Sequence, residues 1–279
     1  MTGVAAVPAI SGSTRLYAVL GDPVAQVRAP GLVNPLFARL GMDAVLVPAR
    51  VGRDELADVV RGLGRIASLH GLLVTVPHKA AVCALADTLG PAAALAGSAN
   101  VLRREPDGRL TAENFDGLGF VRGLEAAGHT VDGRRLTLIG GGGTGSAIAA
   151  AALSAGAARV CVHDVDAARL TSLLSRLDER WPGRAHAAGP GDLRTADLAV
   201  NATPLGLRAG DPLPFDPSAV RPDAVVVDIV MEPHDTALLR RAAREGRRVH
   251  HGIHMLEQQV SCYREFFDWP QPDPRGASR

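Results

Sequence analysis

The segment Leu136-Thr-Leu-Ile-Gly-Gly-Gly-Gly-Thr-Gly145 decides the fold of this chain. Its first four residues form a short, mostly apolar run that predicts a buried strand over 136–139, and the alanine-rich residues 146–155 predict a helix. Between them, Gly140, Gly142 and Gly145 match the G-x-G-x-x-G spacing of a dinucleotide-binding turn. In such a turn the first glycine allows a tight reversal, the second lets the backbone approach a pyrophosphate, and the third lets the helix pack closely on the strand.

The residues around this turn favour a nucleotide site. A second apolar run, 159–163, predicts the next strand and ends at Asp164. An acid about 20 residues beyond the glycines can accept hydrogen bonds from the adenosine ribose hydroxyls. Gly143 and Thr144 belong to the predicted site, because a helix N-terminus offers free N–H groups to phosphate. The alternative is a glycine turn that serves only close packing, and the flanking strand pattern makes the nucleotide site the better interpretation.

The bulk composition argues against two classes of partner. The 279 residues are 47% hydrophobic and 21% charged, which is ordinary for a chain long enough to form two domains. The formal net charge of +1 gives no electrostatic footprint for nucleic acid or for an anionic membrane. The basic run 240–248 is best explained as the solvated face of a helix.

The three cysteines are far apart and match neither a disulfide framework nor a metal motif. We therefore expect reduced thiols and a cytoplasmic protein. No run of about 20 apolar residues predicts a membrane span. A small-molecule substrate is the expected partner, with the chain acting as a monomer or homodimer.

Apolar runs alternate with helical segments, which predicts an α/β fold with parallel pairing. In the first part of the chain, a helix is expected over 80–89 and strands are expected at 16–20, 44–48, 71–76, 100–102 and 110–112. A helix over 117–127 then links to a second part. The strands of that part are expected near Leu136, Val160, Leu198 and Val225. A final helix is expected over 255–267.

Several short motifs, in order and with characteristic spacing, resemble the shikimate/quinate dehydrogenase family over roughly residues 17–267. The matching pieces are Gly-Asp-Pro at 21–23, Thr-Val-Pro-His-Lys at 75–79, Gly-Ser-Ala-Asn at 97–100, Asn-Phe-Asp-Gly at 114–117, the glycine turn, Asn-Ala-Thr at 201–203, and Gly-Ile-His-Met-Leu at 252–256 with Gln259. The resemblance implies an N-terminal α/β substrate domain, a Rossmann domain, and C-terminal helices that return to the first domain. We expect residues 1–115 plus 252–279 to form the substrate domain and 116–251 the Rossmann domain, with the site between them.

The resemblance implies that Lys79 and Asp116 are the catalytic pair. Hydride transfer to or from a secondary alcohol requires a proton to move on or off its oxygen. A lysine beside a carboxylate can supply that proton, an effect of about 10²–10⁴-fold. The resemblance also implies that Thr75, Asn100 and Gln259 contact the substrate. Without the family, a surface ion pair would be the ordinary explanation of one lysine and one aspartate.

The chain departs from the family at five polar positions. The family's Ser-x-Ser-Pro, whose hydroxyls hold the substrate carboxylate, is Val27-Arg28-Ala29-Pro30 here. Leu73 stands where the family has asparagine, Phe115 where it has threonine, and Met231 near its tyrosine. Because each lost hydrogen bond to a charged group is worth about 1.5–3 kcal/mol, we expect weak or absent turnover of shikimate.

Two side chains within these motifs have open interpretations. Arg28 can clamp a substrate carboxylate bidentately. It can also point to solvent, which we favour. His78, beside the catalytic lysine, can line the site or serve in packing.

The segment after the second Rossmann strand predicts NAD as the cofactor, with NADP less favoured. Relatives that use NADP carry Asn-Arg-Thr there, whereas this chain has His163-Asp164-Val165-Asp166. A carboxylate repels a 2′-phosphate and can bind two ribose hydroxyls instead. The remaining cofactor contacts implied by the resemblance are Asn201, Thr203, Pro204, Ile229 and Gly252. No metal is expected, since His250, His251 and His254 complete no carboxylate–histidine motif.

We therefore expect an NAD-dependent oxidoreductase that acts on a secondary alcohol of a small cyclic hydroxy acid and not on shikimate itself. Lys79 and Asp116 are expected to perform the acid–base chemistry. One alternative is an authentic shikimate or quinate dehydrogenase. Another is a nucleotide-sensing module that kept the fold and lost turnover. Retention of Lys79, Asp116, Asn100 and Gln259 argues against the sensor.

Overall fold

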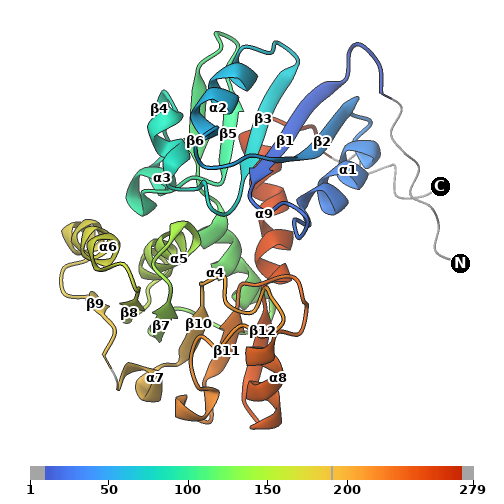
Figure 1. Ribbon diagram of the computed structural model, residues 1–279. Coiled ribbons are helices and arrows are strands. Elements are labelled where there is room, and N and C mark those ends of the chain that lie inside the picture. Colours follow the sequence, from blue (N-terminus) through green and yellow to red (C-terminus); the bar gives the residue numbers. More distant parts are fainter. Residues whose placement is uncertain (1–9, 190, 272–279) are drawn as a thin grey trace, which may run out of the picture.

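The computed structural model describes residues 10–189 and 191–271, which form two six-stranded sheets with helices packed on them. Figure 1 shows the sheet of the N-terminal part above and the second sheet below, with two long helices between them. The predicted α/β fold is confirmed.

The first sheet has the strand order β2-β1-β3-β5-β6-β4. Its strands are β1 (Arg15–Gly21), β2 (Ala44–Arg50), β3 (Leu69–Val74), β4 (Thr88–Leu89), β5 (Val101–Arg104) and β6 (Leu110–Glu113). The helices of this part are α1 (Ala29–Arg39), α2 (Leu56–Gly64), the 3₁₀ helix η1 (Ala81–Leu85) and α3 (Pro91–Ala96). β1 pairs in parallel with β2 and β3, whereas β5 pairs antiparallel with both β3 and β6. This sheet is therefore mixed, and the β5–β6 hairpin sits where the two short strands were expected.

The second sheet has the order β12-β11-β10-β7-β8-β9, with parallel pairing throughout. Its strands are β7 (Arg135–Ile139), β8 (Arg159–His163), β9 (Ala185–Ala187), β10 (Leu198–Asn201), β11 (Val225–Asp228) and β12 (Arg248–His251). The helices are α5 (Gly143–Ser154), α6 (Ala167–Arg180), α7 (Asp192–Thr195), the 3₁₀ helix η2 (Pro217–Ala219) and α8 (Ala237–Arg244). The outer strands β9 and β12 were not predicted.

Two helices connect the sheets: α4 (Asp116–Ala126) and α9 (Ile253–Phe266), which pack against each other. The buried face of α4 lies in the same core as the second sheet and α5. Tyr263 of α9 and the following Phe267 are buried with Tyr17 of β1 in a core of the first part. The chain thus returns to its first part, as the family resemblance implied.

The prediction of a helix over 80–89 is wrong. The structure has the short 3₁₀ helix η1 followed by β4, because Thr88 and Leu89 pair with Thr111 and Ala112 of β6. That pairing is a long-range contact, which local helical spacing cannot reveal. Within the described ranges, no helix is both long enough and apolar enough to cross a membrane.

Candidate active site

The structure brings Lys79 and Asp116 together in a buried ion pair. Lys79 lies in the turn after β3, and Asp116 is the first residue of α4. The Lys79 Nζ donates to Asp116 Oδ2 at 2.5 Å, and the two side chains are 11% and 2% exposed. A carboxylate at a helix N-terminus is stabilised by the helix dipole. The loss of either partner would leave the other charge buried and uncompensated, which is strongly destabilising.

A buried polar network holds the other oxygen of Asp116. Asn100 Nδ2 donates to Asp116 Oδ1 at 2.9 Å, and Gln259 Nε2 donates to the same atom at 3.2 Å. Asn100 is itself fixed, since its Oδ1 accepts from the Phe115 backbone N–H at 2.9 Å. The network therefore fixes the orientation of the carboxylate, and it unites three residues that were predicted for the site from distant motifs.

Tyr263 belongs to this network and was missed by the sequence analysis. Its hydroxyl donates to Gln259 Oε1, one helical turn earlier on α9. Burial, together with the nearby Asp116 charge, raises the pKa of Tyr263 well above its usual value, so the phenol stays protonated. The i, i+4 spacing of Gln259 and Tyr263 was the available signal.

Thr144 joins the catalytic pair to the glycine turn. Its Oγ1 accepts from Lys79 Nζ at 2.9 Å and donates to Asp116 Oδ2 at 3.2 Å. Gly143 also touches the lysine, since a Cβ placed on it would lie 2.7 Å from the Lys79 Cβ. The sequence placed Thr144 among the cofactor contacts, and the structure places its hydroxyl on the Lys79–Asp116 pair.

Thr75 and His78 lie in the same turn as the lysine. The Thr75 methyl packs against Gly21, and within the described part of the chain its hydroxyl makes no hydrogen bond. His78 is buried, and its Nε2 lies 2.7 Å from the Val51 carbonyl oxygen. Of the two interpretations of His78, the contact favours packing.

The five apolar replacements lie in one hydrophobic cluster, which also contains Tyr263. Ala29 and Leu73 are buried in this cluster, and Val27, Phe115 and Met231 are half-buried against it. Phe115 immediately precedes Asp116, and its ring centroid lies 6.2 Å from that of Tyr263. We call these five residues the apolar wall.

Arg28 is exposed, and its side chain has a protein partner. Its guanidinium forms an ion pair with Glu232, in the loop after β11. The two side chains are about half exposed, and the pair spans from the start of α1 to the second sheet.

The glycine turn has the geometry that its sequence predicted. Gly140 has φ +106°, and a Cβ on Gly145 would lie 1.9 Å from the Gly140 carbonyl oxygen, so both positions require glycine. At Gly142, by contrast, an added Cβ would meet no atom within 4 Å. The turn therefore packs closely at Gly140 and Gly145 and leaves the backbone open at Gly142, where a pyrophosphate requires close approach.

Asp164 lies at the end of β8 with its carboxylate against the turn. Its Oδ2 accepts from the Gly141 N–H at 2.7 Å, and its Oδ1 accepts from the Asp166 N–H at 2.8 Å. The Arg169 guanidinium lies 3.5 Å from Oδ2. The side chain is 4% exposed. The carboxylate is thus fixed beside the turn.

The other predicted cofactor contacts brace the loops after β10 and β11. Asn201 Nδ2 donates to Asp228 Oδ1 at 2.9 Å, and its Oδ1 accepts from the Thr203 N–H at 3.0 Å. Burial raises the pKa of Asp228 to about 6. Pro204 is exposed, whereas Gly252 packs so closely on Ile229 that a Cβ on it would lie 2.4 Å from the Ile229 carbonyl oxygen.

An amine that can release a proton, fixed beside a nucleotide-binding turn, is what alcohol oxidation by a nicotinamide nucleotide needs. The protein is therefore in the class of NAD(P)-dependent dehydrogenases that act on a CH–OH group. The family model described as the shikimate dehydrogenase substrate binding domain matches residues 19–102. A shikimate dehydrogenase (NADP(+)) of Rubrobacter xylanophilus is 40% identical over 278 residues, which cover 96% of this chain and 95% of that protein. The chain belongs to the shikimate dehydrogenase family.

Solved structures show the same architecture. The shikimate 5-dehydrogenase of Listeria monocytogenes, in complex with shikimate and NAD, has a TM-score of 0.82 and 29% identity, with 94% of each chain covered. The ligand-free 5-ketofructose reductase of a Gluconobacter species has a TM-score of 0.77 and 26% identity, and the match covers 94% of this chain and 96% of that one.

Proposed function

We propose that the protein catalyses reversible hydride transfer between NAD and a secondary alcohol of a small cyclic hydroxy acid other than shikimate. The observation that carries this is the buried Lys79–Asp116 pair in direct contact with Thr144 of the glycine turn. It supports a site in which proton transfer and the nucleotide-binding turn adjoin. We keep the division into a substrate domain (1–115 plus 252–279) and a Rossmann domain (116–251), and a cytoplasmic monomer or homodimer, as part of this proposal.

The composition of the chain supports the role of Lys79. Of its 30 lysine and arginine residues, Lys79 is the only lysine. A guanidinium stays protonated under all ordinary conditions, whereas an ammonium can give up a proton when its surroundings favour it. An arginine in this position could hold negative charge but could not exchange a proton with an alcohol. The single lysine therefore stands where the reaction needs its chemistry.

The bound nicotinamide supplies the hydride acceptor or donor, and this chain supplies the rest. Lys79 gives a proton to the substrate oxygen or takes one from it, and Asp116 stabilises the ammonium form. Asn100 and Gln259 keep the Asp116 carboxylate aimed at the lysine, through their bonds to its other oxygen. Thr144 positions the lysine by accepting from Nζ, so that the amine is fixed relative to the turn.

The apolar wall supports a substrate with fewer polar groups than shikimate. A wall of Val27, Ala29, Leu73, Phe115 and Met231 has no side-chain donor for a carboxylate, and a buried charged group without partners binds poorly. The likeness to a 5-ketofructose reductase supports this reading, because the architecture is not confined to proteins named for shikimate.

Authentic shikimate dehydrogenation is the second candidate. The 40% identity to a shikimate dehydrogenase over nearly the whole of both chains favours it. Arg28 is the cation that could then replace the missing hydroxyls, after leaving Glu232.

We propose NAD as the preferred cofactor because of Asp164. Its carboxylate is held against the turn by two backbone N–H groups, where it can accept from ribose hydroxyls and repel a 2′-phosphate. The Rubrobacter relative is named for NADP(+), and the Listeria structure holds NAD, so relatives with either cofactor exist.

A substrate panel tests the proposal. Shikimate, quinate, less hydroxylated cyclic hydroxy acids and neutral polyols are assayed with NAD and with NADP, for wild type, Lys79→Ala and Lys79→Arg. We expect turnover of a less hydroxylated acid with NAD, and a loss of about 10²–10⁴-fold in kcat for both variants. NADH fluorescence titration of Lys79→Arg, which keeps a positive charge opposite Asp116, should show unchanged binding. Full activity of Lys79→Arg would contradict the proton-transfer role, and NADH binding without turnover across the panel would favour the sensor.

A further inference from the structure

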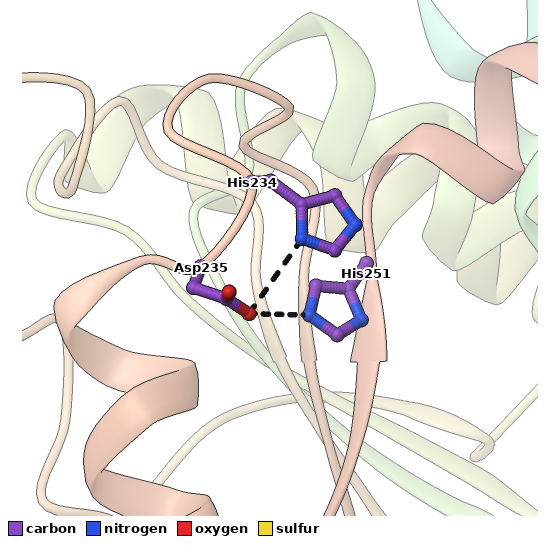
Figure 2. Close-up of side chains that lie close together, drawn as sticks. All are labelled: His234, Asp235 and His251. Carbon is purple, nitrogen blue, oxygen red and sulfur yellow. Dashed lines mark hydrogen bonds and ion pairs between the residues drawn. The ribbon is translucent and has the colours of Figure 1, made fainter.

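A cluster of two histidines and one aspartate lies at the edge of the second sheet, apart from the catalytic pair. His251 is the last residue of β12, and His234 and Asp235 lie in the loop between β11 and α8. Their ligand atoms all lie within 4.8 Å of one another, and no other group of this kind occurs in the described ranges. Figure 2 shows both rings presenting a nitrogen to the same carboxylate oxygen.

We propose that His234, Asp235 and His251 bind a divalent transition-metal ion of the Zn²⁺ class. Two imidazoles and one carboxylate are a donor set that Zn²⁺ accepts, with water in the fourth position of a tetrahedron. Metal–ligand bonds of about 2.0–2.1 Å place tetrahedral ligand atoms about 3.4 Å apart. The Asp235 Oδ1 lies 2.9 Å from His251 Nε2 and 3.6 Å from His234 Nδ1, so two of the three edges bracket that value.

The geometry of the cluster suits a cation. The Oδ1 atom of Asp235 faces a ring nitrogen of each histidine. The two rings are stacked, with centroids 4.2 Å apart and planes 18° apart, so both lie against the same carboxylate. One divalent ion satisfies both nitrogens and the carboxylate together.

The cluster is exposed to solvent at His234 and Asp235, whereas His251 is largely shielded. His234 and Asp235 have 62% and 64% exposed side chains, whereas His251 is 20% exposed. Solvent can therefore deliver an ion and complete its coordination. The nearby Arg240 donates to the Asp235 carbonyl oxygen and not to its carboxylate.

An ion at this place would tie the loop after β11 to the segment that opens α9. His251 precedes Gly252, which packs directly on Ile229 at the start of that loop. The same loop carries Met231 of the apolar wall and Glu232, the partner of Arg28. Metal binding would thus brace the loop that carries part of the wall.

The test is binding of the metal alone to the full, tag-free chain after chelator treatment. Isothermal titration with ZnCl₂ should show one ion per chain with micromolar or tighter affinity, and Co²⁺ should give the intense visible bands of a tetrahedral site. His251→Gln and Asp235→Asn should each weaken Zn²⁺ binding by at least about tenfold. Loss of a contact that only supports a ligand already costs about 10- to 100-fold in metal affinity, and loss of the ligand itself should cost at least as much.

His254→Gln is the matched control. His254 Nδ1 lies 3.1 Å from Glu257, an exposed histidine–carboxylate pair that belongs to no group of three ligands within the described residues. We expect its affinity for Zn²⁺ to equal that of wild type. No binding by wild type, undiminished binding by His251→Gln, or an equal loss in His254→Gln would each overturn the proposal. Circular dichroism and thermal melts without metal show whether each variant is folded.

Discussion

The polar network and the apolar wall differ in composition, since the first consists of hydrogen-bonded polar side chains and the second of aliphatic and aromatic ones. On one side, Asn100 and Gln259 are buried and hydrogen-bonded to the Asp116 carboxylate. On the other, Leu73 is buried in a hydrophobic cluster and Phe115 packs against it, while the Phe115 backbone N–H donates to Asn100 of the network. A buried polar network is stable only when its members satisfy one another, and this one does. The comparison suggests that the chemistry of the site is fixed by the network, whereas the choice of substrate is left to the wall.

Restoring hydroxyls to the wall should change the kinetics with shikimate more than any other test of this comparison. The double variant Val27→Ser plus Ala29→Ser places two donors near the start of α1. Since each hydrogen bond to a charged group contributes about 1.5–3 kcal/mol, kcat/KM for shikimate should rise at least about tenfold. The rise should appear mainly in KM, because these contacts bind ground state and transition state alike.

Ala38→Ser is the control for that experiment, as Ala38 is exposed on the same helix. It should leave the kinetics with shikimate unchanged. If wild type already turns over shikimate at a micromolar KM, or if the double variant gains nothing, the wall does not govern substrate choice.

The cofactor end offers the next largest effect. Asp164→Ala removes the carboxylate that faces the turn and releases Arg169 from it. We expect kcat/KM with NAD to fall and kcat/KM with NADP to rise. The ratio of the two should narrow by about tenfold, which corresponds to the loss of one hydrogen bond to a charged group. Measuring both cofactors at a fixed substrate concentration gives the ratio.

Asp166→Ala is the control, because Asp166 pairs with the same arginine at 2.8 Å and makes no contact with the turn. Asp166→Ala should release Arg169 without removing the Asp164 carboxylate. The NAD over NADP preference should therefore change less in Asp166→Ala than in Asp164→Ala. An unaltered preference in Asp164→Ala would count against the role of Asp164.

Thr144 tests whether the network and the turn act as one unit. Thr144→Val removes the hydroxyl between Lys79 and Asp116 while keeping its shape. Loss of a hydrogen bond worth about 0.5–1.5 kcal/mol predicts a fall in kcat of about 2- to 10-fold. KM should be nearly unchanged and the pH profile of kcat displaced, since the proton-transferring amine loses a partner.

Thr144→Ser restores the hydroxyl and should recover wild-type kcat and pH profile. A purely structural role would instead lower stability in both variants and leave the pH profile in place. Equal kinetics of Thr144→Val and wild type would show that the turn and the catalytic pair are independent.

The sequence predicted most of the nucleotide-binding half, because its signals are local. The apolar run before Gly140 and the alanine-rich segment after it each have a period or composition that specifies one element. The failures came from distant pairing: β4 forms only against β6, so no helical pattern over 80–89 could reveal it. The edge strands β9 and β12 are short and carried no strong apolar run.

Within the candidate site, residue types could be predicted and contacts could not. Lys79 and Asp116 stand in motifs that the family resemblance identified, yet their contact with Thr144 depends on how the two sheets approach each other. The partner of Arg28 is Glu232, about 200 residues further along, and neither flanking sequence indicates it. Helix spacing could have found Tyr263, since it lies four residues after Gln259.

The smallest expected effect concerns that Arg28–Glu232 ion pair. Glu232→Gln releases the guanidinium, which could then meet a carboxylate at the wall. Because exposed ion pairs contribute about 0.2–1 kcal/mol, KM for shikimate should fall by only about 1.4- to 5-fold. A neutral alcohol substrate should show no change, which separates charge recognition from loop movement.

Asp22→Asn is the matched control for loss of an exposed acid, because it frees Arg50 in the same way. It should leave KM unchanged for acids and neutral substrates alike. If Glu232→Gln also changes nothing, Arg28 does not reach the substrate, and the apolar wall has no cation to compensate for its missing hydroxyls. Substrate choice would then depend on shape and apolar contact alone. The polar network would serve the chemistry, and the apolar wall would select the substrate without any charged group.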